Sequence, residues 1–383
     1  MQNLIEQLTH ELDQLKAASS YRMLREIEQQ DRGIAIYQNR RMFNLSGNDY
    51  LGIACDEAWQ QEFLRSPQAF GLSSAYSRLL TGNHTPFVEL EALLSERYQG
   101  KSALVFNSGY HANTGVLPAL AKKGDLILAD KLNHASLIDG LRLGSAEFAR
   151  YRHLDYADLE RRLIAAQGKY RQIFVVTESV FSMDGDLADL TRLVELKKKY
   201  GAFLMVDEAH SVGCLGKDGC GACSDAGLLR DVDFIMGTLG KAFGSYGAFG
   251  IMAPVIREYL INTMRPFIFT TGLAPINVAW TRYVLSRMPE LESRRTRLKR
   301  LGDRLREIIR RHGYQTLGES QIVPLIVGEN DKAGALAERL QEKGILVFPI
   351  RPPTVPVGTA RLRFSLSSAL PDEALDRIDE VLS

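Results

Sequence analysis

The sequence predicts an α/β fold in which a mainly parallel sheet is covered by helices on both faces. Short runs rich in Val, Ile, Leu and Phe alternate along the chain with helical patterns, the order typical of parallel sheets. These runs are apolar almost throughout, as expected for strands that are buried on both sides. The chain has 383 residues, of which 45% are hydrophobic and 24% charged, so its composition supports a packed core.

The predicted strands of this sheet occupy the middle of the chain. They cover residues 102–107, 125–130, 171–178, 202–208 and 232–238. Helical patterns separate them, for example over residues 158–168 and 188–201, where Gly201 stands in the position of a C-cap. A further helix is predicted before the first strand, from Thr85 to Gly100.

The character of the chain changes near Pro275, where a long Arg-rich helical stretch begins that continues to about Gly313. After it the sequence predicts a smaller α+β unit with strand 322–328, helix 333–344, strand 345–350, strand 360–367 and helix 372–383. We expect residues 46–285 to form a large domain and residues 286–383 a small C-terminal α+β domain. Residues 1–45 are expected to form a helix and a lead-in strand that pack with the small domain.

The charge and the N-terminus of the chain bear on its partners and location. The net charge is +1 and the pI is near 7.7, which gives no reason to expect nucleic acid or an anionic membrane as a partner. No apolar run approaches the roughly 20 residues of a spanning helix. The first residues form an amphipathic helix rather than a signal sequence, so we expect a cytoplasmic protein. Its leucines are Leu4, Leu8, Leu12 and Leu15.

Metal and redox sites find little support. Cys220 and Cys223 have the spacing of a redox or zinc motif, but a single CxxC pair is weak, and we expect ordinary reduced thiols. Asp207 and His210 have the spacing of half a metal site. No further carboxylates or histidines cluster with them, so we expect no metal.

Four of the predicted strand ends carry unusual residues, and ligands of open parallel sheets bind beyond the carboxyl ends of the strands. After strand 102–107, the small residues of NSGYHANTG lead into a helix. The N–H groups of Gly109 and Tyr110 are therefore candidates for binding an anion, although a plain strand–helix turn is the other interpretation. The segment contains neither a dinucleotide-binding fingerprint nor a P-loop pattern.

The next two strand ends carry His134 and Asp207. His134 follows strand 125–130 and is either a capping or core histidine or a flat ring that stacks on an aromatic cofactor. Asp207 ends a strongly apolar strand, so we expect its carboxylate to be buried. Burial of a charged carboxylate is costly unless a cation or several donors accompany it.

The fourth strand end contains Lys241 within GTLGKAFGSYGAFG. Lysine is rarely buried, and glycines on both sides allow a ligand to approach the backbone. In a site of low dielectric a lysine loses its proton and becomes a nucleophile toward carbonyl groups. An exposed lysine in a flexible turn is the other interpretation.

A single cofactor accounts for all four strand ends. Pyridoxal phosphate needs an amine for its aldehyde, an anion for its ring nitrogen, a flat group for its ring face and donors for its phosphate. Lys241, Asp207, His134 and the turn at Gly109 and Tyr110 supply one of these each. Two further hydroxyls come from Ser182 and Thr238. The sequence therefore predicts that Lys241 carries pyridoxal phosphate.

The motifs around these residues resemble those of the α-oxoamine synthases, which are fold-type I pyridoxal-phosphate enzymes. The motifs are NDYLG (48–52), SGYHAN (108–113), DKLNHAS (130–136), ESVFSMDGD (178–186), VDEAHSVGCLG (206–216), GTLGKAFGSYG (237–247), FIFTTGLAP (267–275) and RPPTVPVGTARLR (351–363). They span nearly the whole chain in order. The resemblance implies a transferase that condenses an amino acid with an acyl thioester and releases carbon dioxide.

The resemblance also implies roles for individual residues. The catalytic residues would be Lys241, Asp207, His134 and His210, with His210 at the phenolic oxygen of the cofactor. Gly109, Tyr110, Ser182 and Thr238 would bind cofactor polar groups, and Thr270 and Thr271 would reach the phosphate in a neighbouring subunit. A homodimer with a shared active site follows. The implied substrate-binding positions are Arg22, Asn48, His134, Thr354 and Arg363, of which Arg363 would clamp the amino-acid carboxylate.

Within this family the segment 351–363 is most similar to the branch that condenses L-alanine with a pimeloyl thioester in biotin biosynthesis. Its acyl carrier is coenzyme A or an acyl carrier protein. The Arg-rich run 293–311 would suit an acidic carrier, although a solvated helix face is the commoner meaning. Phe87 and Leu370 stand where the family often has histidine. The alternatives are another branch, such as glycine C-acetyltransferase or an autoinducer synthase, and a non-catalytic cofactor-binding protein.

Overall fold

The computed structural model describes residues 3–18, 20–66 and 71–383, and the chain forms two compact units. The larger unit consists of Asp49–Ser182 and Asp186–Thr296. The smaller unit consists of Met1–Asn48, Met183–Gly185 and Arg297–Ser383. Neither unit is a continuous stretch of chain. Met183–Gly185 interrupts the larger unit, and the smaller unit consists of three separate segments.

The core of the larger unit is a seven-stranded sheet with the strand order β4-β10-β9-β8-β7-β5-β6. The strands are β4 (Ser102–Phe106), β5 (Leu126–Asp130), β6 (Glu147–Tyr151), β7 (Ile173–Glu178), β8 (Phe203–Asp207), β9 (Phe234–Thr238) and β10 (Ala248–Met252). All are parallel except β10, which lies antiparallel to both β4 and β9. The predicted mainly parallel sheet and its five predicted strands are confirmed, whereas β6 and β10 had not been expected.

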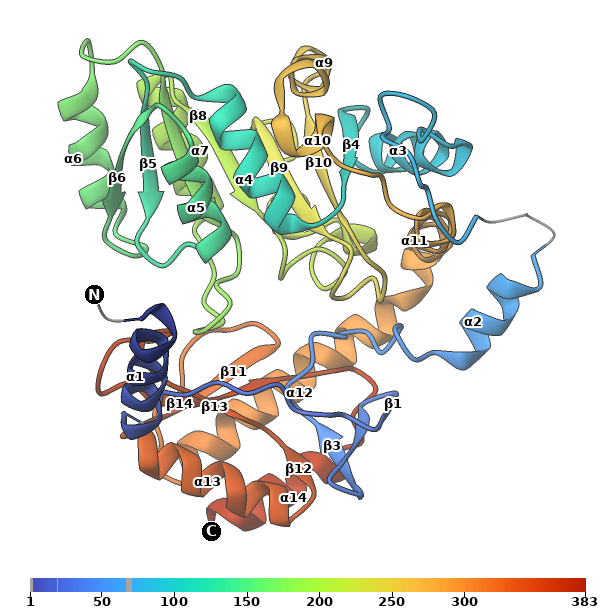
Figure 1. The fold of residues 1–383 in the computed structure, drawn as a ribbon, viewed down its shortest axis with the longest axis vertical. Helices are drawn as coiled ribbons and strands as arrows, with labels where there is room; N and C mark the ends of the chain where they lie inside the picture. Colours follow the sequence, from blue (N-terminus) through green and yellow to red (C-terminus); the bar gives the residue numbers. More distant parts are fainter. Residues whose placement is uncertain (1–2, 19, 67–70) are drawn as a thin grey trace. The chain divides into compact units, whose positions relative to one another are not determined.

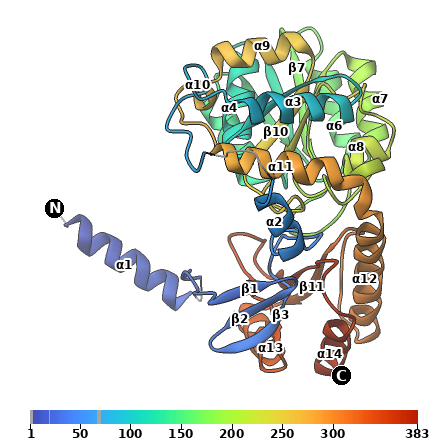
Figure 2. The same cartoon turned by 90° about the vertical axis from the view of Figure 1, so that its right-hand side faces the viewer.

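Helices cover both faces of this sheet, as expected for βαβ units. Figures 1 and 2 show α4 (Gly109–Leu120) and α5 (Ala135–Leu143) on one face, with α6 (Tyr156–Ala166) and α7 (Leu190–Tyr200) on the other. The C-cap of α7 is Gly201 with φ +64°, as predicted. The other helices of this unit are α2 (Glu57–Leu64), α3 (Thr85–Arg97), η1 (Lys217–Gly219), α8 (Ala222–Asp225), α9 (Pro254–Thr263), α10 (Arg265–Ile268), α11 (Pro275–Arg287) and η2 (Met288–Leu291).

The smaller unit contains two short sheets. One has the order β1-β2-β3-β12, with β1 (Gln29–Asp31), β2 (Ile34–Tyr37), β3 (Arg40–Asn44) and β12 (Ile345–Leu346). The other has the order β11-β14-β13, with β11 (Ile322–Gly328), β13 (Pro349–Ile350) and β14 (Ala360–Ser365). The expected single strand 345–350 is therefore wrong, because its two ends pair in different sheets. Pro349 has no N–H for a continuous ladder, which favours the break.

Four helices complete this part of the chain: α1 (Leu4–Ala17), α12 (Glu292–Arg311), α13 (Asn330–Glu342) and α14 (Glu373–Leu382). The arginines of the Arg-rich run are largely committed to partners within the smaller unit. Arg297 and Arg300 pair with Asp372, Arg304 pairs with Asp376, and Arg311 pairs with Asp379. These ion pairs connect α12 to α14 along the length of α14, from its N-cap Asp372 to Asp379. They leave fewer unpaired cations on α12 than the sequence suggests for binding an acidic carrier.

Two further expectations concern the termini and the thiols. The leucines of α1 form an apolar stripe, and Leu4, Leu8, Leu12 and Leu15 are between 43% and 64% exposed. Within the described residues, no helix combines the length and apolarity needed to span a membrane. All four cysteines are free thiols, as expected.

Candidate active site

Asp207 is the buried acid at the centre of the site. It ends β8, is 3% exposed and lies beside the end of β7, where Glu178 is its register partner. The side chain of Asn113 donates to Oδ2 at 2.8 Å, and the N–H of Ala209 donates to Oδ1 at 2.9 Å. Burial raises the pKa of Asp207, while the Asn113 donor and the positive charge of Lys241 act in the opposite direction. The expected burial of this carboxylate among donors is confirmed.

The side chain of Lys241 contacts His210, which lies three residues after Asp207. Its Nζ lies 3.0 Å from Nε2 of His210, and Nδ1 of His210 lies 2.7 Å from the hydroxyl of Tyr50. Lys241 is half-buried, whereas His210 and Tyr50 are buried. The exposed-turn interpretation of Lys241 is therefore wrong, because its amine is held against a buried imidazole.

The backbone that carries Lys241 is the loop 239–247 between β9 and β10. Leu239 and Gly247 are joined by a backbone hydrogen bond of 2.9 Å, and the N–H of Gly244 donates to the carbonyl of Lys241 at 2.9 Å. Gly244 has φ +55°, and a Cβ at this position would lie 2.6 Å from the nitrogen of Ala54. Glycine is therefore required to bring the turn this close to its neighbour.

His134 begins α5 as its N-cap. Its Nδ1 accepts from the N–H of Ser136 at 3.2 Å and lies 2.8 Å from the Ser136 hydroxyl. Its own N–H donates to Glu178 Oε1 at 2.5 Å. The capping interpretation of His134 is thus confirmed, and the cap leaves the ring close enough to feel the charges of Asp207 and Lys241.

The N-terminus of α4 supplies donors for an anion. Ser108 is the N-cap and its hydroxyl accepts from the N–H of His111 at 3.1 Å. Among the described residues, no protein group accepts from the N–H groups of Gly109 and Tyr110. The side chain of Tyr110 is 51% exposed and donates to Asp139 at 2.5 Å. The two N–H groups at the start of a helix form the kind of site that binds phosphate.

The remaining hydroxyls of the larger unit lie in turns. Thr238 ends β9, and its hydroxyl donates to the carbonyl of Gly247 at 3.3 Å. Ser182 is half-buried in the turn that follows β7. Thr270 and Thr271 lie next to Asn107, whose side chain contacts the Thr270 hydroxyl at 3.1 Å and the Thr271 carbonyl at 2.7 Å. These two threonines thus approach the start of α4 in their own chain.

The expected substrate positions of the smaller unit form two contacts. Arg363 of β14 donates to Asn48 Oδ1 at 3.4 Å. Arg22 donates to the Thr354 hydroxyl at 3.0 Å, and both side chains are exposed. Arg363 shares its face of β14 with Arg361, which forms an ion pair with Asp184. The structure thus brings together the members of each pair.

The two departures from the family pattern are core residues. Phe87 is 1% exposed in α3, and the guanidinium of Arg78 lies 4.2 Å from the centre of its ring. Leu370 is fully buried, and its carbonyl accepts from Arg297 at 2.6 Å. Both side chains fill space in the interior.

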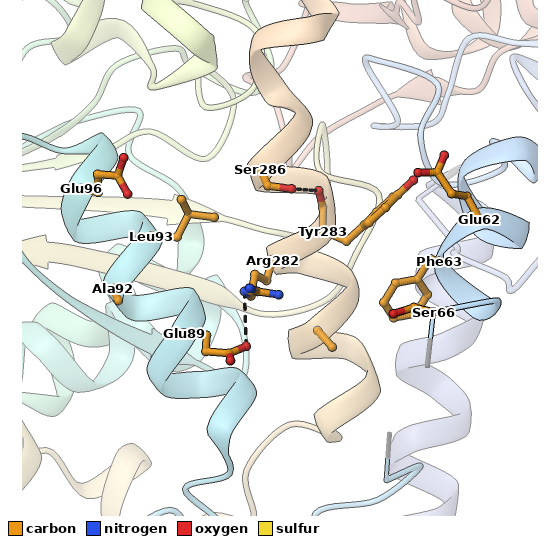
Figure 3. Close-up of a pocket in the computed structure, with 11 residues that line it drawn as sticks. Glu62, Phe63, Ser66, Glu89, Ala92, Leu93, Glu96, Arg282, Tyr283 and Ser286 are labelled. Atoms are coloured by element: carbon orange, nitrogen blue, oxygen red, sulfur yellow. Dashed lines mark hydrogen bonds and ion pairs between the residues drawn. The ribbon is translucent and has the colours of Figure 1, made fainter. Parts of the chain in front are cut away.

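A separate pocket of about 650 Å³ lies between α2, α3 and α11 of the larger unit (Figure 3). Its lining includes Glu62, Glu89 and Glu96, and Arg282 pairs with Glu89 at 3.3 Å. It contains none of the predicted site residues and no lysine, so it does not match a site for an aldehyde cofactor.

The residues around Asp207 fit pyridoxal phosphate in kind. They provide an amine, a buried carboxylate, an imidazole at a helix start and two N–H groups that donate to no acceptor within the described part of the chain. The region also contains residues that the sequence did not single out, namely Tyr50, Asn113, Ser136 and Glu178. Among residues 3–18, 20–66 and 71–383, no three His, Cys, Asp or Glu side chains are grouped to hold a metal ion.

Known proteins agree with this fit. The family model described as aminotransferase class I and II matches residues 40–382. An 8-amino-7-oxononanoate synthase from Chlorobaculum parvum is 49% identical over 379 residues, which cover 97% of each chain. A serine palmitoyltransferase structure from S. paucimobilis with bound PLP has a TM-score of 0.92 at 30% identity and covers 100% of this chain and 98% of its own.

A second solved structure, the 8-amino-7-oxononanoate synthase of Francisella tularensis, has a TM-score of 0.77 at 28% identity and covers 89% of this chain and 96% of its own. Both structures share the fold-type I architecture. The match of the family model over most of the sequence, together with a relative of 49% identity over nearly the full length, identifies the family. The chain belongs to the aminotransferase class I and II family of pyridoxal-phosphate proteins, and within it to the 8-amino-7-oxononanoate synthases.

Proposed function

We propose that this protein condenses L-alanine with a pimeloyl thioester to give 8-amino-7-oxononanoate, carbon dioxide and a free thiol, as a step of biotin biosynthesis. The acyl carrier is coenzyme A or an acyl carrier protein. The observation that carries the proposal is the contact between Lys241 and His210, three residues after the buried acid Asp207. A relative of 49% identity with the name of this enzyme supports the choice of substrates.

Pyridoxal phosphate, when bound, supplies an aldehyde that condenses with an amine and a ring that takes up negative charge from the neighbouring carbon. Lys241 would hold the aldehyde through Nζ. Once alanine has taken its place, the same amine would remove the proton from the alanine Cα and return one after decarboxylation. Asp207 would hold a proton on the ring nitrogen, a task that suits a buried carboxylate with two donors in place.

Several residues would orient the cofactor. His210 would bind the phenolic oxygen, with Tyr50 holding the opposite ring nitrogen of His210. His134 would lie against the ring. The N–H groups of Gly109 and Tyr110 would bind the phosphate together with the hydroxyls of Ser182 and Thr238. Thr270 and Thr271 would reach the phosphate of a second copy of the chain, which makes the working unit a homodimer with a shared active site.

The smaller unit would bind the substrates. Arg363 would clamp the alanine carboxylate with two N–H groups, and Asn48, which contacts Arg363, would align the guanidinium. Arg22 and Thr354 would contact the acyl substrate. In this proposal the larger unit is the cofactor domain expected over residues 46–285. The smaller unit combines the regions expected at 1–45 and 286–383, and the protein acts in the cytoplasm.

The test is a substrate panel with the purified full chain loaded with pyridoxal phosphate. L-Alanine with pimeloyl-CoA is compared with glycine and acetyl-CoA, L-serine and palmitoyl-CoA, and L-alanine with pimeloyl carrier protein. Thiol release and the mass of the amino ketone are recorded. Product from alanine and a pimeloyl thioester alone supports the proposal. Faster turnover of another pair assigns the chain to a different branch, and cofactor binding without turnover of any pair contradicts an enzymatic function.

A further inference from the structure

A chain of buried hydrogen bonds links Asp207 to the ring of His134. The amide nitrogen of Asn113 donates to Asp207 Oδ2 at 2.8 Å and to the Ser136 hydroxyl oxygen at 3.0 Å. The Ser136 hydroxyl lies 2.8 Å from His134 Nδ1. Asn113 is 1% exposed and Ser136 is 2% exposed. The four residues come from α4, α5, its N-cap and the end of β8, and the two contacts of Asn113 join segments that are distant in sequence, whereas that of Ser136 with His134 is local.

The directions of these hydrogen bonds determine which ring nitrogen of His134 carries the proton. The N–H of Ser136 can only donate, and it points to Nδ1 at 3.2 Å. Nδ1 must therefore present a lone pair. Because Asn113 donates to the Ser136 oxygen, the hydroxyl proton of Ser136 is available for Nδ1 as well. Two donors at Nδ1 leave Nε2 as the protonated nitrogen of a neutral ring.

The backbone of His134 is fixed by a separate contact. Its N–H donates to Glu178 Oε1 at 2.5 Å, and the preceding Asn133 donates from its side chain to the carbonyl of Val176 at 2.9 Å. Both acceptors belong to β7, the strand next to β8. The ring of His134 is thus held through Nδ1 while its backbone is held by the sheet.

Four charged or titratable groups face His134 from the elements packed around it. They are Asp207 on β8, Lys241 after β9, Asp139 on α5 and Glu178 on β7. Burial lowers the pKa of His134, the charges of Asp207 and Asp139 raise it, and that of Lys241 lowers it, with a net decrease. The two donors at Nδ1 require an uncharged ring, and burial favours the same form.

We propose that Asn113 and Ser136 are positioning residues that hold His134 as a neutral imidazole protonated at Nε2 and connect its orientation to Asp207. This inference rests on the proposed function, in which His134 lies against the cofactor ring and Asp207 holds the ring nitrogen protonated. A neutral imidazole can lie against a cationic ring without charge repulsion. Asn113 and Ser136 would thereby fix the position of the Asp207 carboxylate relative to the ring of His134, without contacting the substrate themselves.

The test follows the ring nitrogens of His134 directly. The full chain is labelled with ¹⁵N-histidine, and long-range ¹H–¹⁵N correlation spectra are recorded between pH 5 and 8, with and without pyridoxal phosphate. The signal is assigned by its loss in His134→Gln. In the wild-type protein we expect one tautomer, protonated at Nε2 and neutral at pH 7. A cationic ring, or a ring protonated at Nδ1, would overturn the proposal without any variant.

Variants then test the two positioning residues. Ser136→Ala is expected to raise the pKa of His134 toward the ordinary value of about 6.5, to mix the two tautomers and to weaken cofactor binding by about 3–10-fold. Ser136→Thr, which keeps the hydroxyl, should restore the single tautomer. Asn113→Ala should disturb the same signal and also weaken cofactor binding. Ser74→Ala is the matched control, because Ser74 is equally buried at 2% and donates to the carbonyl of Tyr76.

The outcomes separate this inference from the proposed function. An unchanged His134 signal in both Ser136→Ala and Asn113→Ala, in a wild-type enzyme that makes the amino ketone, contradicts the positioning role alone. A wild-type chain that makes no product contradicts the proposed function, whatever the tautomer. Should Ser136→Ala fail to fold, the wild-type spectrum and Asn113→Ala still decide the question.

Discussion

Nζ of Lys241 lies 3.0 Å from Nε2 of His210, so the two residues meet inside the larger unit although 30 residues separate them in sequence. Lys241 sits in the turn after β9, and His210 follows β8, the neighbouring strand. The contact holds the amine near the buried acid Asp207. An amine in this position should carry the cofactor.

Lys241→Ala should abolish covalent retention of pyridoxal phosphate and lower turnover at least about 100-fold, because the amine that holds the aldehyde and moves the proton is gone. Retention is measured by borohydride reduction followed by mass spectrometry of the protein. Lys131→Ala, an exposed lysine, is the control and should keep the label. A label that remains in Lys241→Ala would locate the attachment elsewhere.

Asp207→Asn should weaken cofactor binding by about 10–100-fold, because an amide cannot hold a cationic ring nitrogen by charge. Exchange of the alanine Cα proton into D₂O, followed by NMR, should fall with it. The variant keeps the volume of the side chain, but its NH2 group faces one of the two donors that Asp207 accepts from, so the melting temperature of the apoprotein is measured beside cofactor binding. Exchange at the wild-type rate would contradict the role of Asp207.

Tyr50→Phe removes the hydroxyl that contacts His210 Nδ1 at 2.7 Å. We expect kcat to fall by about 3–10-fold with little change in KM, since the imidazole loses a partner that fixes its tautomer. The matched control is Tyr98→Phe. Tyr98 is also buried, at 2% exposed, and packs against Phe249. Equal effects of the two substitutions would reduce the role of Tyr50 to packing.

Arg363→Lys should raise the KM for alanine by about 10–100-fold, since a lysine cannot form the two parallel hydrogen bonds of a guanidinium with a carboxylate. The KM for the acyl thioester should change less. Arg300→Lys serves as the control, because Arg300 is exposed on α12 and pairs with Asp372 at 3.3 Å. An unchanged KM for alanine in Arg363→Lys argues against the clamp.

The stability of the protein should depend on pH through His153. This ring contacts Asp130 through Nδ1 and Asp186 through Nε2, each at 2.8 Å. Burial alone would lower the pKa of His153, but the hydrogen bonds to the two aspartates outweigh it and raise the pKa to about 9. A raised pKa means that the charged ring stabilises the fold fully below about pH 6.5, and that this contribution is lost as the pH rises through 9.

We therefore expect the free energy of unfolding to fall by about 1–2 kcal/mol between pH 6.5 and 9, a value reduced for the partial exposure of the ring. Urea unfolding at several pH values measures it. His153→Gln should be less stable at pH 6 and should lack this part of the pH dependence. A wild-type profile that is flat over this range, or identical in the variant, would show that the two contacts contribute little.

The sequence predicted the sheet well where its strands are buried on both sides. The strands β5, β7 and β8 are apolar runs with no exposed residue, and a periodicity argument finds such runs readily. β6 escaped prediction because it is an edge strand with exposed residues, and β10 because it follows a glycine-rich turn that hides where the turn ends.

The candidate site was predictable in part for the same reason. Asp207 ends an apolar strand and Lys241 follows one, and parallel strands bring such positions to one edge of the sheet. Tyr50, Asn113 and Ser136 were not singled out, although each lies in a motif that was noticed. A tyrosine, an amide and a serine carry no local sign of function, and their contacts depend on segments that meet only in the folded chain.

The parallel pairing of β3 with β12 joins two strands that the ribosome synthesises at very different times. Ile345 lies against Phe43, so β3 finds its partner strand only after all the residues between them have been synthesised. A ribosome that adds about 5–20 residues per second needs roughly 15–60 s to cover that interval. The hairpin of β2 and β3 therefore leaves the exit tunnel long before β12 is synthesised. By then all seven strands of the sheet in the larger unit have been synthesised.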